Sequence, residues 1–262
     1  LIKYKSMSNE RNTALSKDYF TKEFPQGWEV EWKGNLFTHD PSGFIFQLYE
    51  IVSEGKLSPY KLSSSLGSLP LNIRVFDYIF HFYGHKEQNV WIEDFVLAQP
   101  HETDVFIPRI KKSVPIQRFE SLNSNVIIRL EKQKEDLKNK FSGNLIKGFV
   151  DEFETKNNIK TELVGTIKRE RHSFYITNME SNRNWGILAD RSILISSPKK
   201  NVLSQVEFEY KGRNGISYTN LLSQTEAIQE MDNLGSELTI KTGVDRLIPT
   251  RLTKFEWITS LL

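Results

Sequence analysis

Two segments far apart in the sequence carry the same alternation of charged and apolar residues. The first, Trp28–Gly34, reads WEVEWKG, and the second, Val206–Gly212, reads VEFEYKG. Side chains on a β-strand alternate between its two faces, so each segment predicts a strand with two glutamates and a lysine on one face and apolar residues on the other. Taken alone, either segment is typical of an amphipathic strand whose charged face contacts water.

The chemistry of these segments depends on whether the two strands are neighbours. If they are, four carboxylates gather within about 10 Å, because residues two apart on a strand lie about 7 Å apart and adjacent strands about 4.8 Å apart. The four are Glu29, Glu31, Glu207 and Glu209. Such a cluster requires a bound cation, interleaved lysines or raised pKa values, since like charges at about 4 Å repel by about 1 kcal/mol even in water. We expect Mg²⁺ or Mn²⁺, because these ions prefer oxygen ligands and are commonly completed by substrate phosphates.

The two segments resemble the CYTH superfamily, also called the triphosphate tunnel metalloenzymes. The hallmark of that family is an E-x-E-x-K strand near the N-terminus, which Glu29–Lys33 matches, and a late E-x-E strand, which Glu207–Glu209 matches. Thr166–Phe174 followed by Trp185–Asp190 is similar to the basic strand of the family and a following strand with an acidic residue. Phe76–Tyr83 loosely resembles its D-x-Y-type strand. The resemblance covers roughly Trp28 to Lys254.

The resemblance implies an eight-stranded antiparallel barrel, a triphosphate tunnel, whose acidic floor binds metal and whose basic walls bind a triphosphate. The family includes tripolyphosphatases, thiamine triphosphatases, class IV adenylate cyclases, polyphosphate polymerase domains and fungal or viral RNA 5′-triphosphatases. The implied activity is metal-dependent removal of the terminal phosphate from inorganic tripolyphosphate or from a nucleotide or organic triphosphate, with one of the glutamates as general base.

Three other interpretations stay open. An RNA 5′-triphosphatase of the mRNA capping type would act on an RNA 5′ end, although the chain lacks the K-x-D-G motif of a guanylyltransferase. A non-catalytic barrel would bind a phosphorylated ligand or a partner protein, because fold does not imply function. A structural protein with two coincidental acidic strands would place Glu31 and Glu209 far apart.

Basic residues are required beside the acids, because a triphosphate carries about four negative charges and pairs well with the planar fork of arginine. Arg169 and Arg171 share one strand face, whereas Lys168 belongs to the other. The catalytic assignments are Lys33, Arg169, Arg171 and Lys211, and the substrate-binding assignments are Lys168, Arg129 and Lys254. Asp190 joins the four glutamates as a metal ligand, because an acid that follows the apolar run 186–189 is costly unless it is paired or metal-bound.

The composition excludes several classes of protein and site. The absence of cysteine excludes disulfides, thiolate zinc sites, iron–sulfur clusters and a cysteine nucleophile. Lys and Arg (35) nearly balance Asp and Glu (33), so a net charge of +2 gives no general attraction to DNA or to a membrane. No segment approaches the roughly 20 apolar residues of a membrane span, and the first residues lack a secretory signal, so we expect a cytoplasmic protein. His81 and His85 have the H-x₃-H spacing, but their strand and turn context disfavours zinc.

The elements that must position these residues are mostly strands. The 262 residues predict one α+β domain, residues 1–262. Strands are predicted at Trp28–Gly34, Asn72–Tyr83, Asn89–Ala98, Asp104–Lys112, Glu162–Thr177, Trp185–Ser196 and Gln205–Arg213, with an eighth near Glu237–Lys241. Helices are predicted at Thr13–Phe24, at Gly43–Leu57 after a capping Asp40 or Ser42, at Leu222–Asn233, and most strongly at Lys132–Lys156. Val126–Glu131 fits either a strand or the first turns of that last helix. We expect the antiparallel sheet to close into an eight-stranded barrel with helices packed outside.

Overall fold

One curled antiparallel sheet dominates the fold. The computed structural model describes residues 23–25, 28–37, 40–63, 73–85, 90–97, 106–112, 125–133, 150–152, 154–156, 158–214, 221–243 and 247–261. The strands are β1 (Trp28–Leu36), β2 (Tyr60–Leu62), β3 (Arg74–His85), β4 (Val90–Leu97), β5 (Phe106–Lys112), β6 (Val126–Gln133), β7 (Glu162–Asn178), β8 (Arg183–Leu194), β9 (Asn201–Arg213) and β10 (Leu247–Pro249). The helices are α2 (Pro41–Ser53), α5 (Leu221–Thr242) and α6 (Lys254–Ser260).

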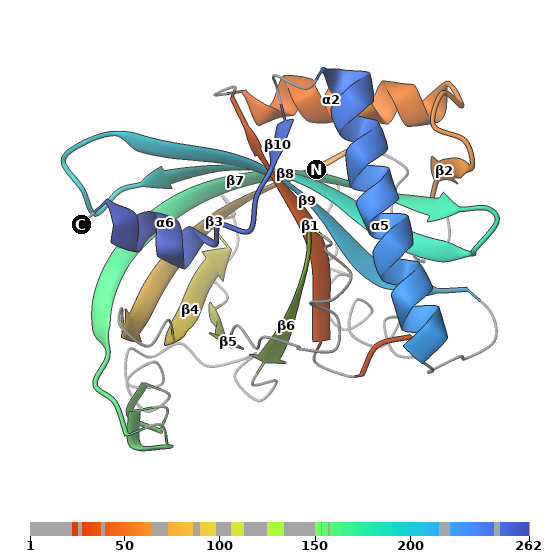
Figure 1. The fold of residues 1–262 in the computed structure, drawn as a ribbon. Coiled ribbons are helices and arrows are strands. Elements are labelled where there is room, and N and C mark those ends of the chain that lie inside the picture. Colours follow the sequence, from red (N-terminus) through yellow and green to blue (C-terminus); the bar gives the residue numbers. More distant parts are fainter. Residues whose placement is uncertain are drawn as a thin grey trace, which may run out of the picture.

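Eight of these strands close into a barrel. The hydrogen-bonded order is β1-β6-β5-β4-β3-β7-β8-β9, and β9 then pairs with β1 to complete the ring. Every pairing in the ring is antiparallel, while β10 adds to β1 and β2 adds to β7. In Figure 1, β7, β8 and β9 cross the middle of the view below α2, and β4, β5 and β6 lie beneath them. Closure of the ring gives hydrogen-bond partners to backbone N–H and C=O groups that would be unpaired on the edge strands of an open sheet. The expected α+β fold with an eight-stranded antiparallel barrel is confirmed.

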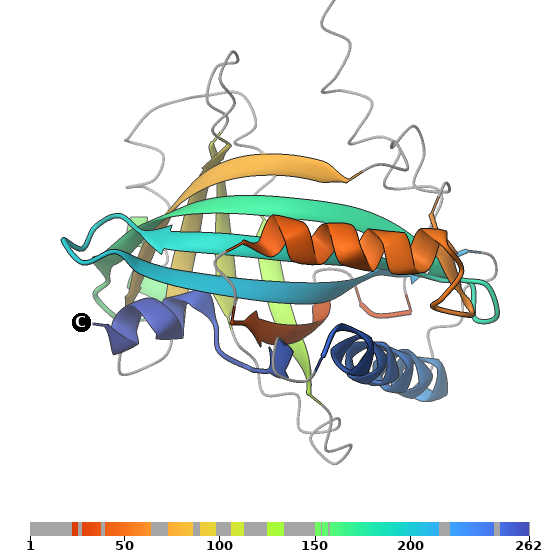
Figure 2. The same ribbon diagram turned by 90° about the horizontal axis from the view of Figure 1, so that it is seen from above.

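Helices α2 and α5 lie against one side of the barrel, α2 over β7 and β8 and α5 beside β1, as the view from above shows (Figure 2). The apolar sides of β1, β7, β8 and β9 pack against them in one core. Its buried members include Val30, Trp32, Phe174, Ile176, Trp185, Ile187, Val206 and Phe208 from the strands and Phe44, Ile45, Leu48, Ala227, Met231 and Leu234 from the helices. The rings of Trp32 and Phe208 stack with centroids 5.0 Å apart. Burial of each large apolar side chain stabilises the fold by about 1.5–3 kcal/mol, so this packing fixes which face of each strand points outward.

The ends of the two shorter helices follow from local sequence. Asp40 accepts hydrogen bonds from the backbone N–H groups of Ser42 and Gly43, and Pro41 opens α2. The N-terminus of α6 has a capping box, in which the Thr253 hydroxyl accepts from the Glu256 N–H and the Glu256 carboxylate accepts from the Thr253 N–H. No described helix is long and apolar enough to cross a membrane.

Two sequence expectations about the elements are wrong. Glu237–Lys241 belongs to α5 and not to a strand, because apolar residues at helical spacing continue through it and pack against the barrel. The eighth strand is instead β6, so Val126–Glu131 is a strand and the helix predicted from Lys132 cannot start there. Residues 150–152 and 154–156 are helical, whereas 134–149 lie outside the described residues. Residues 13–22 of the first predicted helix also lie outside them, and Phe24 lies in a bend.

Candidate functional site

The two carboxylate strands, β1 and β9, are direct neighbours. Their register sets Glu31 opposite Glu209 and Lys33 opposite Glu207. Since the apolar faces of both strands pack under the helices, the charged faces point into the barrel. The expectation that the two strands are neighbours is therefore confirmed for the segment that holds Glu31, Glu207 and Glu209, and the interpretation that placed Glu31 and Glu209 far apart is wrong.

Lysines lie between the carboxylates of this inner face. The Lys33 ammonium lies 3.1 Å from Glu31 Oε1 and 3.1 Å from Glu207 Oε1, and its side chain is only 3% exposed. Lys211 Nζ lies 2.6 Å from Glu209 Oε2. Burial opposes a charge on Lys211, but the Glu209 carboxylate more than compensates and raises the lysine pKa. Interleaved lysines thus relieve the repulsion between the glutamates in this structure.

Asp190 is the most deeply buried acid of the cluster. Its two carboxylate oxygens accept from Arg171 Nε at 2.6 Å and Arg171 Nη2 at 2.7 Å, and Arg169 lies 3.4 Å away. Arg171 also donates to Glu207 Oε2 at 2.6 Å. Burial would raise the pKa of Asp190, but Arg171, Arg169 and Lys254 outweigh it and hold the pKa below its ordinary value. Arg169 and Arg171 therefore share the inward face, as expected from their spacing.

One inward cation comes from outside the barrel strands. Lys254, the first residue of α6, reaches Glu207 Oε1 at 2.9 Å and Asp190 Oδ2 at 3.1 Å. Burial, together with the nearby charges of Lys33 and Arg169, lowers the pKa of Lys254 more than these two carboxylates raise it. Burial also opposes the charge on Glu207, but Lys254, Lys33 and Arg171 hold its pKa well below the ordinary value. Within the buried Lys254–Glu207 pair, each residue thus favours the charged form of the other.

The remaining site candidates lie in different places. Glu29 is partly buried and pairs in register with Arg129, whose side chain lies outside the description of the structure. Lys168 is exposed on the outer face of β7, opposite to Arg169. The Arg169 guanidinium instead lies 4.0 Å from the ring centroid of Phe80, a cation–π contact inside the barrel.

Sequence reasoning missed two neutral polar residues of the inner face, Gln205 and Ser192. Both are fully buried, and Gln205 Nε2 donates to Asn35 Oδ1 and to the Leu252 carbonyl at 3.1 Å each. The available signal was strand period, because Gln205 lies two residues before Glu207 and Ser192 two residues after Asp190. The polar face therefore continues past the charged residues, and a search restricted to charged residues does not find Gln205 and Ser192.

The donor chemistry of the inner acids suits a hard cation, because carboxylate oxygens are ligands that Mg²⁺ and Mn²⁺ prefer. Within the described part of the chain, no group of three or more His, Cys, Asp or Glu side chains is placed to hold a metal ion. Ammonium and guanidinium groups hold the carboxylate oxygens instead. The metal-ligand assignments therefore stay predictions.

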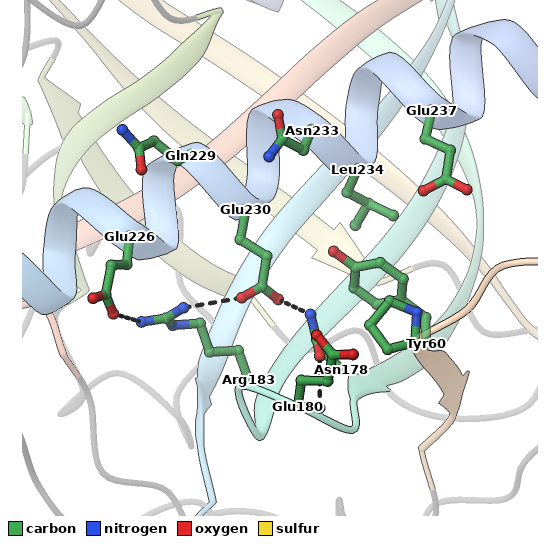
Figure 3. Close-up of a pocket in the computed structure, with 11 residues that line it drawn as sticks. Tyr60, Asn178, Glu180, Arg183, Glu226, Gln229, Glu230, Asn233, Leu234 and Glu237 are labelled. Carbon is green, nitrogen blue, oxygen red and sulfur yellow. Dashed lines mark hydrogen bonds and ion pairs between the residues drawn. The ribbon is translucent and has the colours of Figure 1, made fainter.

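A separate pocket of about 430 Å³ lies outside the barrel, between α5 and the β7–β8 turn (Figure 3). Its charged lining consists of Glu180, Arg183, Glu226, Glu230 and Glu237. The arginine is already bound to Glu230 at 2.9 Å and to buried Glu23 at 2.9 Å. An excess of carboxylates repels phosphate, so this pocket is unsuited to a triphosphate.

Comparisons with known proteins give structural neighbours but no family. No protein-family model matches the sequence, and no curated protein matches it significantly. The chain is similar to a solved structure of the S. pombe Pct1 RNA triphosphatase in complex with the Spt5 CTD, with a TM-score of 0.38 and 10% identity over 92% of this chain and 94% of that chain. A second structure, of the S. pombe Pct1 RNA triphosphatase, gives a TM-score of 0.35 and 11% identity over 90% and 91% of the two chains. Likeness at this level carries no argument about activity.

Proposed function

We propose that this protein is a phosphohydrolase that binds the triphosphate group of its substrate inside the barrel and removes the terminal phosphate. One observation carries the proposal, namely that acids and bases from β1, β7, β8, β9 and α6 alternate on one enclosed inner face. These residues are Glu29, Glu31, Glu207, Glu209 and Asp190 with Lys33, Lys211, Arg169, Arg171 and Lys254. Fixed cations in a water-poor site stabilise phosphate charge without reorganisation during the reaction.

In this proposal the arginines and lysines bind and orient the phosphates. Arg171 has the geometry for this role, because its guanidinium is already held as a planar fork by Asp190 and Glu207. Lys33 and Lys254 would supply further positive charge from either side of Glu207. Charge that develops on the transferring phosphoryl group would then meet cations already in place.

Metal dependence is part of the proposal. Glu31, Glu207 and Glu209 are the carboxylates that would hold Mg²⁺ or Mn²⁺, with Glu29 and Asp190 as further candidates. A bound divalent ion would neutralise phosphate charge and lower the pKa of an attacking water. The lysines that now neutralise these acids would then be available to the phosphates.

The test is release of phosphate from tripolyphosphate, nucleoside triphosphate and 5′-triphosphorylated RNA, each with Mg²⁺, with Mn²⁺ and with a chelator. We expect turnover only with metal, and a fall of about 100-fold or more in Glu31→Gln and Glu209→Gln. Glu180→Gln, an exposed glutamate outside the barrel, serves as the control and should keep the wild-type rate. Undiminished rates in both barrel variants would reject the proposal, and the RNA substrate separates the capping-type alternative from a small-molecule triphosphatase.

A non-catalytic, phosphate-binding barrel is the second candidate, and one observation favours it. Four inner acids already have a lysine or arginine partner, as expected of a site that takes an anion without a metal, namely Glu31, Glu207, Glu209 and Asp190. This candidate predicts tight binding of tripolyphosphate in the presence of a chelator and no product over hours.

A further inference from the structure

The segment that connects β10 to α6, residues 250–253, decides where Lys254 lies. Lys254 is the first residue of α6, and in Figure 1 the chain passes from β10 directly into that helix. Its ammonium lies 2.9 Å from Glu207 Oε1 and 3.1 Å from Asp190 Oδ2. A hydrogen bond is lost once donor and acceptor are about 3.6 Å apart, so a small shift of the segment would separate Lys254 from both acids.

Hydrogen bonds hold this segment against the strands that carry the acids. The Thr250 N–H donates to the Lys33 carbonyl of β1 at 2.9 Å, and the Leu252 N–H donates to the Thr250 hydroxyl at 3.1 Å. The Leu252 carbonyl accepts from Gln205 Nε2 at 3.1 Å. Because Leu252 directly precedes the capping residue of α6, the bond from Gln205 links the start of α6 to β9, the strand of Glu207.

The Gln205 side chain has the chemistry that this contact needs. It is 0% exposed, and its Nε2 also donates to Asn35 Oδ1 at 3.1 Å. A carbonyl can only accept a hydrogen bond, so the NH₂ end of the amide must face Leu252. A carboxylate at this position would instead face the Leu252 carbonyl with lone pairs on both sides. Position 205 therefore needs an amide, although the next two inward residues of β9, Glu207 and Glu209, are acids.

We infer that Gln205 is a positioning residue of the phosphate site, whose amide holds the Leu252 carbonyl and thereby keeps Lys254 beside Glu207 and Asp190. This inference rests on the proposed function, in which Lys254 binds phosphate. It adds a residue that acts through Lys254 and does not itself contact the substrate. Release of the segment moves Lys254 away from the acids, because a buried ammonium group is costly unless it is paired and a long side chain gains rotamer freedom in water.

The first test measures the position of Lys254 without any ligand. The full chain is treated with sulfosuccinimidyl acetate, and peptide mass spectrometry compares acetylation of Lys254, which is 7% exposed, with that of exposed Lys199 in the same chain. Gln205→Met has a side chain of similar length without a donor, and we expect it to raise the Lys254-to-Lys199 ratio about tenfold. Gln205→Asn, whose amide is one methylene shorter, should raise the ratio as well and replaces Gln205→Met if that variant does not fold.

A matched glutamine on α5 provides the control for this test. Gln224 is also buried, and its Nε2 also donates to a backbone carbonyl, that of Glu23 at 2.8 Å. In Gln224→Met the Lys254-to-Lys199 ratio should equal that of the wild type. Equal ratios in folded Gln205→Met and the wild type would overturn the positioning role.

The second test asks whether Gln205 acts on phosphate binding through Lys254. It uses calorimetric titration with tripolyphosphate at one Mg²⁺ concentration. We expect Gln205→Met to weaken binding about tenfold in the wild-type background, but by less than about threefold when added to Lys254→Met. A merely structural role would weaken binding by the same factor in both backgrounds.

The outcomes of the titration separate the inference from the proposed function. Equal factors in the two backgrounds, or wild-type affinity in folded Gln205→Met, would overturn the role of Gln205 while the proposed function stands. Failure of the folded wild type to bind tripolyphosphate would overturn the proposed function and the inference with it.

Discussion

The ion pair between Asp190 and Lys254 joins barrel strand β8 to helix α6, and its contribution to the free energy of unfolding can be measured. Asp190 is 0% exposed and has carboxylate contacts of 2.6 and 2.7 Å to Arg171, 3.1 Å to Lys254 and 3.4 Å to Arg169. Removal of one partner from a buried ion pair destabilises a protein by about 3–5 kcal/mol, because the other charge is left uncompensated. We therefore expect Asp190→Asn to lower the free energy of unfolding by about that amount. Lys254→Met should lower it less, because Arg171 still neutralises both Asp190 and Glu207.

A double-mutant cycle in urea at neutral pH isolates the pairwise term. Groups in direct contact couple by about 0.5–3 kcal/mol, so the double variant should be more stable than the sum of the single variants predicts. Lys160→Met, at a lysine that is 93% exposed and bound to Glu154, provides the control and should be additive with Asp190→Asn. Additivity of Asp190→Asn and Lys254→Met to within about 0.5 kcal/mol would refute the reasoning, because Lys254 would then not reach Asp190 in solution.

Three further predictions concern the same framework. Arg171→Lys should lower the rate of phosphate release from tripolyphosphate about 100-fold, because a lysine ammonium cannot reproduce the planar, forked hydrogen bonds of the guanidinium to Asp190 and Glu207. Circular dichroism should show that the fold is intact. A rate within threefold of the wild type would contradict this prediction. Burial would raise the pKa of Glu23, but hydrogen bonds from Arg183 and Ser223 lower it below its unfolded value of about 4.3. The stability that this carboxylate contributes is therefore complete above about pH 5 and lost as pH falls below about 4. In urea unfolding across pH 3–7, the free energy of unfolding should fall less steeply with falling pH in Glu23→Gln than in the wild type, and an unchanged slope would count against the ion pair between Glu23 and Arg183. Trp185→Phe removes the indole N–H that donates to Glu230 at 2.8 Å and puts a smaller ring in a fully buried position, so it should lower the free energy of unfolding by more than the about 1 kcal/mol of the hydrogen bond alone. Phosphate release should not change, and a loss of activity would connect Glu230 and Arg183 to the site inside the barrel.

The inner face of the barrel was predictable from strand periodicity. The alternation in β1 and β9 places both glutamates and the lysine of each strand on one side, and the spacing of Arg169 and Arg171 does the same for β7. Burial then follows, because the opposite side of each strand is apolar and needs a helix to cover it.

Pairing between distant strands was not predictable from local patterns alone. The segment Glu237–Lys241 alternates over only five residues, and that short signal cannot distinguish a strand from the end of the longer helix α5. β6 was ambiguous for the same reason, since an apolar run followed by charged residues suits either state. Register and closure of the ring depend on contacts between segments that no single window contains.

The contribution of α6 was also beyond sequence reasoning. Its seven residues are too short for a periodic pattern, and its capping residues Thr253 and Glu256 give the only local signal. Lys254 was proposed for substrate binding, but nothing in the sequence indicated that a helix would carry it into the barrel beside Glu207. Neutralisation of the acids by lysine and arginine was one of the alternatives open from the sequence, and it is the one that this structure contains.

Calorimetric titration with tripolyphosphate tests most directly whether the barrel interior is the binding site. We predict one tripolyphosphate per chain for the wild type, at least 100-fold weaker binding in Arg171→Met, and wild-type affinity in Lys199→Met, which removes an exposed lysine beyond the end of β8. Wild-type affinity in Arg171→Met, measured on folded protein, would place the phosphate site elsewhere and contradict the account.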